Sequence, residues 1–208
     1  MDSLIERLKE RARDPKRGVD ERTARTEHVT AALPVSGPAV LDVEADLGFR
    51  LPALLRRIYT DVAGGGFGPG YGLYAIPTGP GAKLEDNLVA RYEQWRSSQK
   101  SPRWPLGLLP LCEWGSGIAS FVDCISPDGP VIRLDPNMPK KDADERIPEA
   151  LRYSRADQVK EACWIESPSI QLWLTSWVDD VKLFYAAYRR PGEDDDLEDD
   201  EEDDGDDE

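Results

Sequence analysis

The sequence predicts an α+β fold: a single domain in which several helices pack against an antiparallel or mixed β-sheet, followed by a disordered acidic C-terminal tail. Three observations predict it. Apolar residues recur at helical spacing between residues 2 and 95 and again after residue 167. Apolar runs separated by turn residues fill the stretch from 104 to 137, which is typical of neighbouring strands. Fourteen of the last sixteen residues are Asp or Glu.

The 208 residues are enough for one domain with appendages. We divide them into a charged N-terminal helical segment (1–35), the α+β domain (36–190) and the acidic tail (191–208). Residues 2–13 are predicted to form a helix that ends at Asp14-Pro15, because the residue before a proline avoids helical geometry. Residues 16–35 are charged and rich in threonine, and we expect them to be partly helical.

The domain is predicted to begin with two helices. Pro38 can open the first and Gly48 can close it, which gives a helix over about 38–47. The second carries one apolar face between residues 51 and 62 and is expected to stop at Gly64. A strand is predicted over Tyr71–Ile76, where aromatic and β-type residues resume. Another helix is expected at Leu84–Trp95.

A glycine-rich turn joins the second helix to that strand. Residues 64–72 contain six glycines: Gly64, Gly65, Gly66, Gly68, Gly70 and Gly72. A phosphate-binding loop needs its glycines after a strand and before a helix, followed closely by Lys. Here the order is reversed, and no Lys follows until Lys83. We therefore interpret these glycines as a structural turn that permits positive φ and close approach of the chain.

The β region is predicted to contain Leu108–Glu113, Ile118–Ile125 and Pro130–Asp135, with a type I turn at Ser126–Gly129 and a further strand at Cys163–Glu166. A loop is expected over 136–149. If the turn sets the register, Asp123 faces Ile132 among apolar neighbours. Such a carboxylate is an acid or a binding-cleft anchor, or it accepts backbone N–H bonds or pairs with an arginine. The last two are the commoner outcomes. The same register places Ser120 opposite Asp135, near Arg133.

The last helix is predicted to start with Ser167 as N-cap and Pro168 in its first turn, and to end near Arg190. Its apolar face includes Val181 and Tyr185. Three tryptophans in and before this helix are expected to pack into the core: Trp164, Trp173 and Trp177.

Catalytic and metal-binding machinery is not evident. His28 is the only histidine, so a catalytic triad or a histidine metal cluster has no basis. Asp123 and Asp135 are expected on opposite faces of the sheet, which argues against an acid–base pair. The three cysteines Cys112, Cys124 and Cys163 have no paired spacing, which indicates reduced thiols in the cytoplasm. We expect no enzyme activity, metal or cofactor, and neither a signal peptide nor a membrane helix.

The charge of the chain lies in its tail. The formal net charge is −15, but residues 1–192 hold 27 acidic and 26 basic residues. A near-neutral body argues against nucleic-acid binding. A run of like charges is expected to be disordered. The tail either solubilises the chain or attracts a basic partner by imitating a polyanion.

Aromatic residues beside glycine-rich loops indicate a surface for a protein partner. Tyr71, Tyr74 and Trp114 flank such loops, and exposed aromatic residues are common interface anchors. With Ser116, Asp123 and Asp128 they form the predicted partner-binding set. Core packing is the alternative for each aromatic residue taken singly.

Taken together, these segments resemble the SUKH superfamily, which holds fungal cell-wall-synthesis regulators and many bacterial toxin-immunity proteins. The matching pieces are LGFRLPALLRRIYTDVAGGGFGPGYGLY, GLLPLCEWGSGIASFVDC, SPDGPVIRLDPN and ESPSIQLWLTSW, within Val40 to Tyr188. The charged first 35 residues and the acidic tail depart from the family pattern, and the turn holds more glycine than usual.

The resemblance implies a cytoplasmic, non-enzymatic protein-binding module. Many bacterial members are immunity proteins that bind and neutralise a cognate toxin, often a nuclease, and such a toxin can be basic. The alternative is a regulatory or scaffolding adaptor of the fungal cell-wall regulator type, without a toxin partner. A composition rich in Ala, Arg, Asp, Gly and Pro and nearly free of Asn is typical of bacteria with GC-rich genomes.

Overall fold

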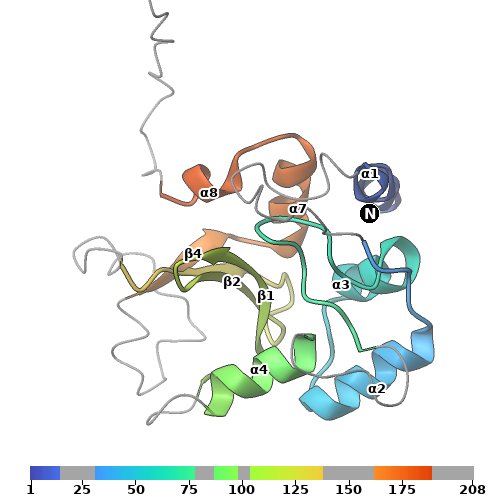
Figure 1. The fold of residues 1–208 in the computed structure, drawn as a ribbon, viewed down its shortest axis with the longest axis horizontal. Helices are drawn as coiled ribbons and strands as arrows, with labels where there is room; N and C mark the ends of the chain where they lie inside the picture. The colour runs from blue at the N-terminus through green and yellow to red at the C-terminus, as the bar shows by residue number, and fades with distance from the viewer. Residues whose placement is uncertain (15–30, 78–86, 98–103, 138–161, 189–208) are drawn as a thin grey trace, which may run out of the picture.

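The predicted α+β fold is confirmed by a computed structural model, in which helices surround one four-stranded antiparallel sheet (Figure 1). The structure describes residues 1–14, 31–77, 87–97, 104–137 and 162–188. The acidic tail, His28, most of the predicted loop at 136–149 and most of the segment 16–35 lie outside the described residues. Residues 31–35, the described end of that segment, are not helical. No helix in the described part is both long and apolar enough to span a bilayer.

The sheet has the order β1-β2-β3-β4, with every neighbouring pair antiparallel. Its strands lie where the sequence predicts them: β1 (Leu108–Gly115), β2 (Ile118–Asp123), β3 (Val131–Leu134) and β4 (Cys163–Ser167). Ser116 and Gly117 join β1 to β2 with φ of 54° and 79°. Two positive φ values define the type I′ turn, whose twist matches that of the flanking strands.

The predicted register between β2 and β3 is wrong by two residues: Phe121, and not Asp123, lies opposite Ile132. The predicted turn does form, since the Gly129 N–H donates to the Ser126 carbonyl at 3.1 Å. The ladder, however, closes at Asp123 and leaves two further residues in the loop. A shift of two residues keeps each side chain on its predicted face, because successive side chains alternate between faces.

Two of the helices begin and end where local sequence predicts. These are α1 (Asp2–Arg13) and α2 (Gly37–Leu47), which Ser36 caps by accepting from the Ala39 N–H and Gly48 ends at φ 79°. The predicted helix over 51–62 is present as α3 (Ala53–Arg57), which continues into η2 (Ile58–Val62), a π-helical turn. Ala63 is extended and ends it just before Gly64.

The predicted strand at Tyr71–Ile76 is wrong, because only an isolated parallel bridge between Ala75 and Asn87 forms there. The segment instead folds back on the glycine-rich turn: the Gly66 N–H donates to the Leu73 carbonyl at 2.9 Å. The following helix, α4 (Leu88–Ser97), starts later than predicted, and residues 84–86 lie outside the described part.

The predicted last helix is divided in two. Its N-cap is Ser169, whose hydroxyl accepts from the Leu172 N–H, whereas Ser167 ends β4. α7 (Ile170–Val178) stops at Asp179, and α8 (Leu183–Ala186) follows. Val181 and Tyr185 are therefore 43% and 47% exposed, contrary to the predicted apolar face. Burial of the three tryptophans at 164, 173 and 177 is confirmed.

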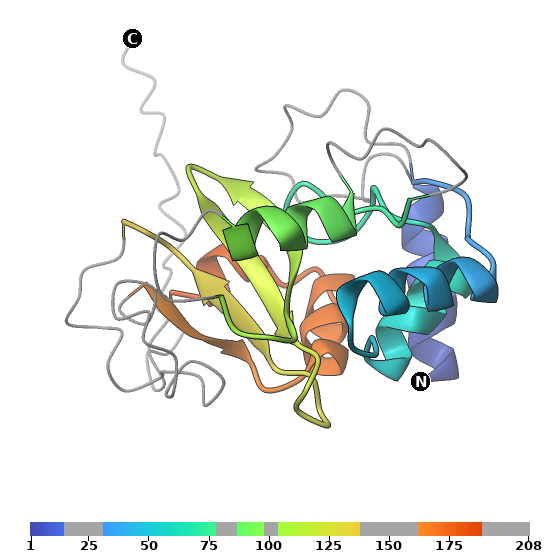
Figure 2. The ribbon, with the colours of Figure 1, turned by 90° about the horizontal axis from the view of Figure 1, so that it is seen from below.

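The helices cover both faces of the sheet. On one face Phe121 of β2 contacts Trp95 of α4, and on the other Trp114 of β1 contacts Phe184 of α8. Figure 2 shows α7 between the sheet and the group formed by α1, α2 and α3. The apolar side of α1, with Leu4, Ile5 and Leu8, belongs to the same core as the sheet.

Candidate partner-binding site

The glycine-rich turn packs along the outer side of β1. The Tyr71 N–H donates to the Glu113 carbonyl and the Tyr74 N–H to the Leu111 carbonyl, both at 2.9 Å. Gly70 makes this approach possible: its φ is 61°, and a Cβ there would lie 2.4 Å from the Glu113 carbonyl oxygen. Gly64 approaches the chain equally closely, since its Cβ would lie 2.7 Å from the Leu33 carbonyl oxygen. At these two positions a side chain would collide with a backbone carbonyl oxygen.

Tyr74 is held in a small polar cluster with residues from β1 and α4. Its hydroxyl donates to Glu113 Oε1 at 2.7 Å, and Arg91 Nη1 lies 3.5 Å from the same oxygen. The Arg91 guanidinium lies 5.6 Å from the centre of the Tyr74 ring, within cation–π range. Burial, and then the neighbouring Glu113 carboxylate, raise the pKa of Tyr74, so the phenol keeps its proton.

Tyr71 lies across the turn between β1 and β2. A Cβ added to Gly115 would come within 2.6 Å of the Tyr71 hydroxyl oxygen, so the phenol lies directly against this glycine. Tyr71 is half-buried, and the neighbouring Ser116 is exposed. We call Tyr71, Tyr74, Arg91, Glu113 and Ser116 the tyrosine surface.

The other three residues of the predicted set lie elsewhere. Trp114 is only 7% exposed, because its ring lies under the Arg133 guanidinium at 4.1 Å on the α8 side of the sheet. Asp123 is buried, and its carboxylate accepts from the Ser126 hydroxyl and from the backbone N–H groups of residues 125 and 126. Asp128 is exposed in the loop after β2, at the opposite end of that strand from Ser116.

A buried ion pair joins β3 and β4 on the α8 side of the sheet, next to Trp114. Arg133 Nη2 donates to Glu166 Oε1 at 2.6 Å, and the two side chains are 0% and 2% exposed. Trp173 Nε1 donates to the same oxygen, and the Ser120 hydroxyl donates to Glu166 Oε2, both at 2.8 Å. Ser120 in turn accepts from Trp114 Nε1 at 2.8 Å, so this network fixes the end of β1.

The network also corrects the predicted polar pairing. Ser120 lies opposite Arg133, not opposite Asp135. Asp135 instead accepts from the Tyr188 hydroxyl at 2.6 Å and from the Asn137 N–H at 2.8 Å. Asp123 ends β2 and Asp135 follows β3, so these carboxylates lie at opposite ends of an antiparallel pair and cannot act on one substrate atom.

Sequence reasoning missed Glu113, Arg91 and Glu166. A signal existed for Glu113, which is the single charged residue within the apolar run Leu108–Trp114. Arg91 and Glu166 are distant in sequence from their partners, and no local pattern marks them.

The titratable residues of the described part do not assemble into a metal site, since no three of its His, Cys, Asp and Glu side chains come together. The three cysteines are not joined in disulfides. Burial raises the pKa of Cys112 and Cys163, which therefore remain thiols at neutral pH.

Comparison of the chain with models of known protein families, with curated proteins and with solved structures gives no match.

Proposed function

We propose that this chain is a non-enzymatic protein-binding module that binds and neutralises a cognate toxin. The observation that supports the proposal most is the tyrosine surface. Tyr71 and Tyr74 are half-buried, and hydrogen bonds from their backbone N–H groups hold both residues on β1. The Tyr74 side chain is also held, because its hydroxyl donates to Glu113 Oε1 at 2.7 Å. An aromatic side chain held in this way is an efficient interface anchor, because little side-chain freedom remains to be lost on binding.

The charges beside these rings favour a polar rim around the anchors. Glu113 and Arg91 lie next to Tyr74, and their side chains are 37% and 24% exposed. Partly exposed charges of both signs set orientation and select partners more than they add affinity. A basic toxin, such as a nuclease, would also be drawn toward the acidic residues of 193–208 during encounter.

The state of the buried carboxylates also supports a binding role. Asp123 and Asp135 are each occupied by hydrogen bonds from their own loops or from Tyr188. A general base needs a carboxylate oxygen that a substrate proton can reach. The resemblance to the SUKH superfamily, whose motifs in this chain include the W-G-x-G turn beside Tyr71, supports the toxin as the class of partner.

The test is co-expression with a toxin encoded beside this gene, with growth protection and direct binding as readouts. We expect protection by the unchanged chain, and an affinity loss of about tenfold or more for Tyr71→Ala. Tyr185→Ala is the control, because Tyr185 is an exposed tyrosine on α8, outside the tyrosine surface, and its substitution should leave binding unchanged. Failure to bind or protect would exclude the immunity role. A gene with no toxin neighbour would favour the regulatory adaptor instead.

A further inference from the structure

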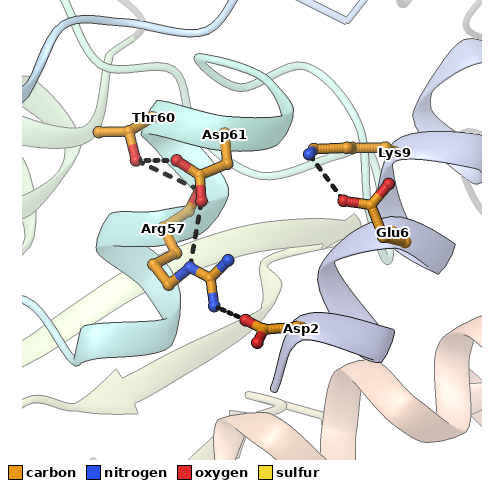
Figure 3. A network of polar contacts seen from close by, with 6 residues as sticks. All are labelled: Asp2, Glu6, Lys9, Arg57, Thr60 and Asp61. Carbon is orange, nitrogen blue, oxygen red and sulfur yellow. Dashed lines mark hydrogen bonds and ion pairs between the residues drawn. The ribbon is translucent and has the colours of Figure 1, made fainter.

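Helix α1 is attached to the rest of the chain through side chains. It lies beside α7 and the teal helix that comprises α3 and η2 (Figure 1). Leu4, Ile5 and Leu8 are buried there. Figure 3 shows Arg57, the last residue of α3, between Asp2 of α1 at 2.5 Å and Asp61 of η2 at 3.1 Å.

Two arginines of α1 bind the acidic end of α7. Arg7 forms an ion pair with Asp179, and Arg11 Nη1 lies 2.7 Å from Asp180 Oδ1. Carboxylates at this place are unfavourable by themselves, because the C-terminal end of a helix already carries partial negative charge. Asp180 also adopts φ 62°, which costs energy for a residue other than glycine. The end of α7 is therefore suited to accept cations from another helix.

The contact between α1 and α7 is incomplete. The Arg11 guanidinium lies over the Trp177 ring, 4.2 Å from its centre, but the buried Trp177 Nε1 has no hydrogen-bond acceptor within the described residues. A groove of about 140 Å³ lies beside this contact, lined by Arg7, Glu10, Arg11 and Asp14 from α1 and its C-cap and by Val178 of α7. Glu10 and Asp14 thus bring negative charge to a groove whose α7 rim is already acidic.

We propose that α1 occupies, within its own chain, a groove that binds a basic amphipathic helix of a partner protein, and that this helix displaces α1. We expect the partner helix to carry the same pattern as α1. That pattern has apolar residues at positions i, i+1 and i+4, as at Leu4, Ile5 and Leu8, and arginines at i+3 and i+7. Such helix-in-groove recognition reads one apolar face and its flanking charges. The site is separate from the tyrosine surface and does not depend on a toxin partner.

Other occupants fit less well. The acidic tail would be repelled by Asp179 and Asp180. A second copy offers only the same α1, which must compete with a tethered segment whose effective concentration is on the order of millimolar. A partner helix with a basic or neutral residue in place of Glu10 would bring one negative charge fewer to the acidic end of α7 than α1 does.

The first test measures hydrogen exchange of the unchanged full chain in about 0.1 M and about 1 M salt. We expect the amides of α1 to exchange by local opening, well before those of β2, and to exchange faster at the higher salt concentration because its ion pairs are screened. Exchange of α1 at the same rate as β2 under both conditions would show that it opens only on global unfolding, and would overturn the proposal.

The second test measures fluorescence anisotropy of a labelled peptide with the sequence of residues 1–14 carrying Glu10→Arg. We expect it to bind full-length Leu8→Asp, in which α1 is loosened, at least about tenfold tighter than the unchanged chain. Adding Asp179→Lys should weaken that binding about tenfold. Asp46→Lys, a change at an exposed acidic residue of α2, is the matched control and should have no effect.

Equal affinity for both chains, or binding to neither, would contradict the proposal. If circular dichroism shows that Leu8→Asp does not fold, the decision rests on hydrogen exchange and on peptide titration of the unchanged chain, where salt-sensitive binding is expected. Light scattering that shows a dimer with exchanged α1 helices would assign the groove to a second copy, and would overturn a separate partner.

Discussion

Glu166→Gln removes the charge of the buried carboxylate while keeping its shape. The remaining carbonyl oxygen can still accept from Trp173 Nε1, and the Ser120 hydroxyl can rotate to accept from the new amide. What is lost is the negative charge that faces Arg133 at 2.6 Å. The variant therefore measures the cost of an uncompensated cation inside the protein.

That cost is expected to be large because solvent does not reach the Arg133 guanidinium. Its side chain is 0% exposed, and its Nε and Nη1 atoms have no hydrogen-bond acceptor within the described residues. Breaking a buried ion pair by removing one partner costs about 3–5 kcal/mol. With a urea dependence of roughly 2 kcal/mol per molar for a domain of this size, the unfolding midpoint should fall by about 1.5–2.5 M.

Urea unfolding followed by tryptophan fluorescence and far-UV circular dichroism measures this midpoint. Arg133→Met/Glu166→Gln is the matched variant, because it removes both charges and should recover most of the loss. A midpoint change below about 0.5 M for Glu166→Gln would refute the reasoning, since Arg133 would then be solvated in some other way. So would a double variant as unstable as the sum of the two single variants.

Two further predictions concern pH and backbone geometry. Because burial raises the pKa of Cys112 and Cys163, the unfolded chain loses these protons first as pH rises. The two thiols should therefore leave the free energy of unfolding independent of pH below about pH 8.5. Above that pH, each thiol should lower the free energy of unfolding by up to about 1.4 kcal/mol per pH unit. Urea unfolding under reducing conditions should show this, with a shallower fall for Cys163→Ala; an equal slope would contradict the assignment. Gly70→Ala should cost about 2–3 kcal/mol in thermal unfolding, through its positive φ and the loss of the Tyr71–Glu113 bond. Gly37→Ala, with open space around its Cβ, should cost nothing, and similar losses for both would exclude the steric explanation.

Helix ends were predictable where one residue decides them. Ser36 and Gly48 bound α2 because a serine hydroxyl and a left-handed glycine each satisfy helix-end groups locally. The break after α7 carries neither glycine nor proline. It depends on Asp180 in a left-handed conformation and on arginines of α1 that are about 170 residues away in sequence, so no local pattern could predict it.

The register between β2 and β3 also could not be predicted from a local sequence pattern. The turn at Ser126–Gly129 was predictable from its proline and glycine, but the ladder ends where the Asp123 carboxylate binds the loop backbone. That arrangement adds two residues to the connection. In the site, the glycines and tyrosines of the turn were found from sequence, whereas Glu113 and Arg91 become partners of Tyr74 only through folding.

The glycine-rich turn has a consequence for solubility. β1 is an edge strand, and the carbonyls of residues 111 and 113 on its outer side are occupied by Tyr74 and Tyr71. Aggregation commonly begins when an edge strand with free backbone groups pairs with a strand of another molecule. The two bonded carbonyls of β1 are not available for such pairing. Substitutions that lift the turn from β1 should therefore promote intermolecular sheet growth even where the core stays folded. The glycine-rich turn therefore opposes self-association through β1, in addition to positioning Tyr71 and Tyr74.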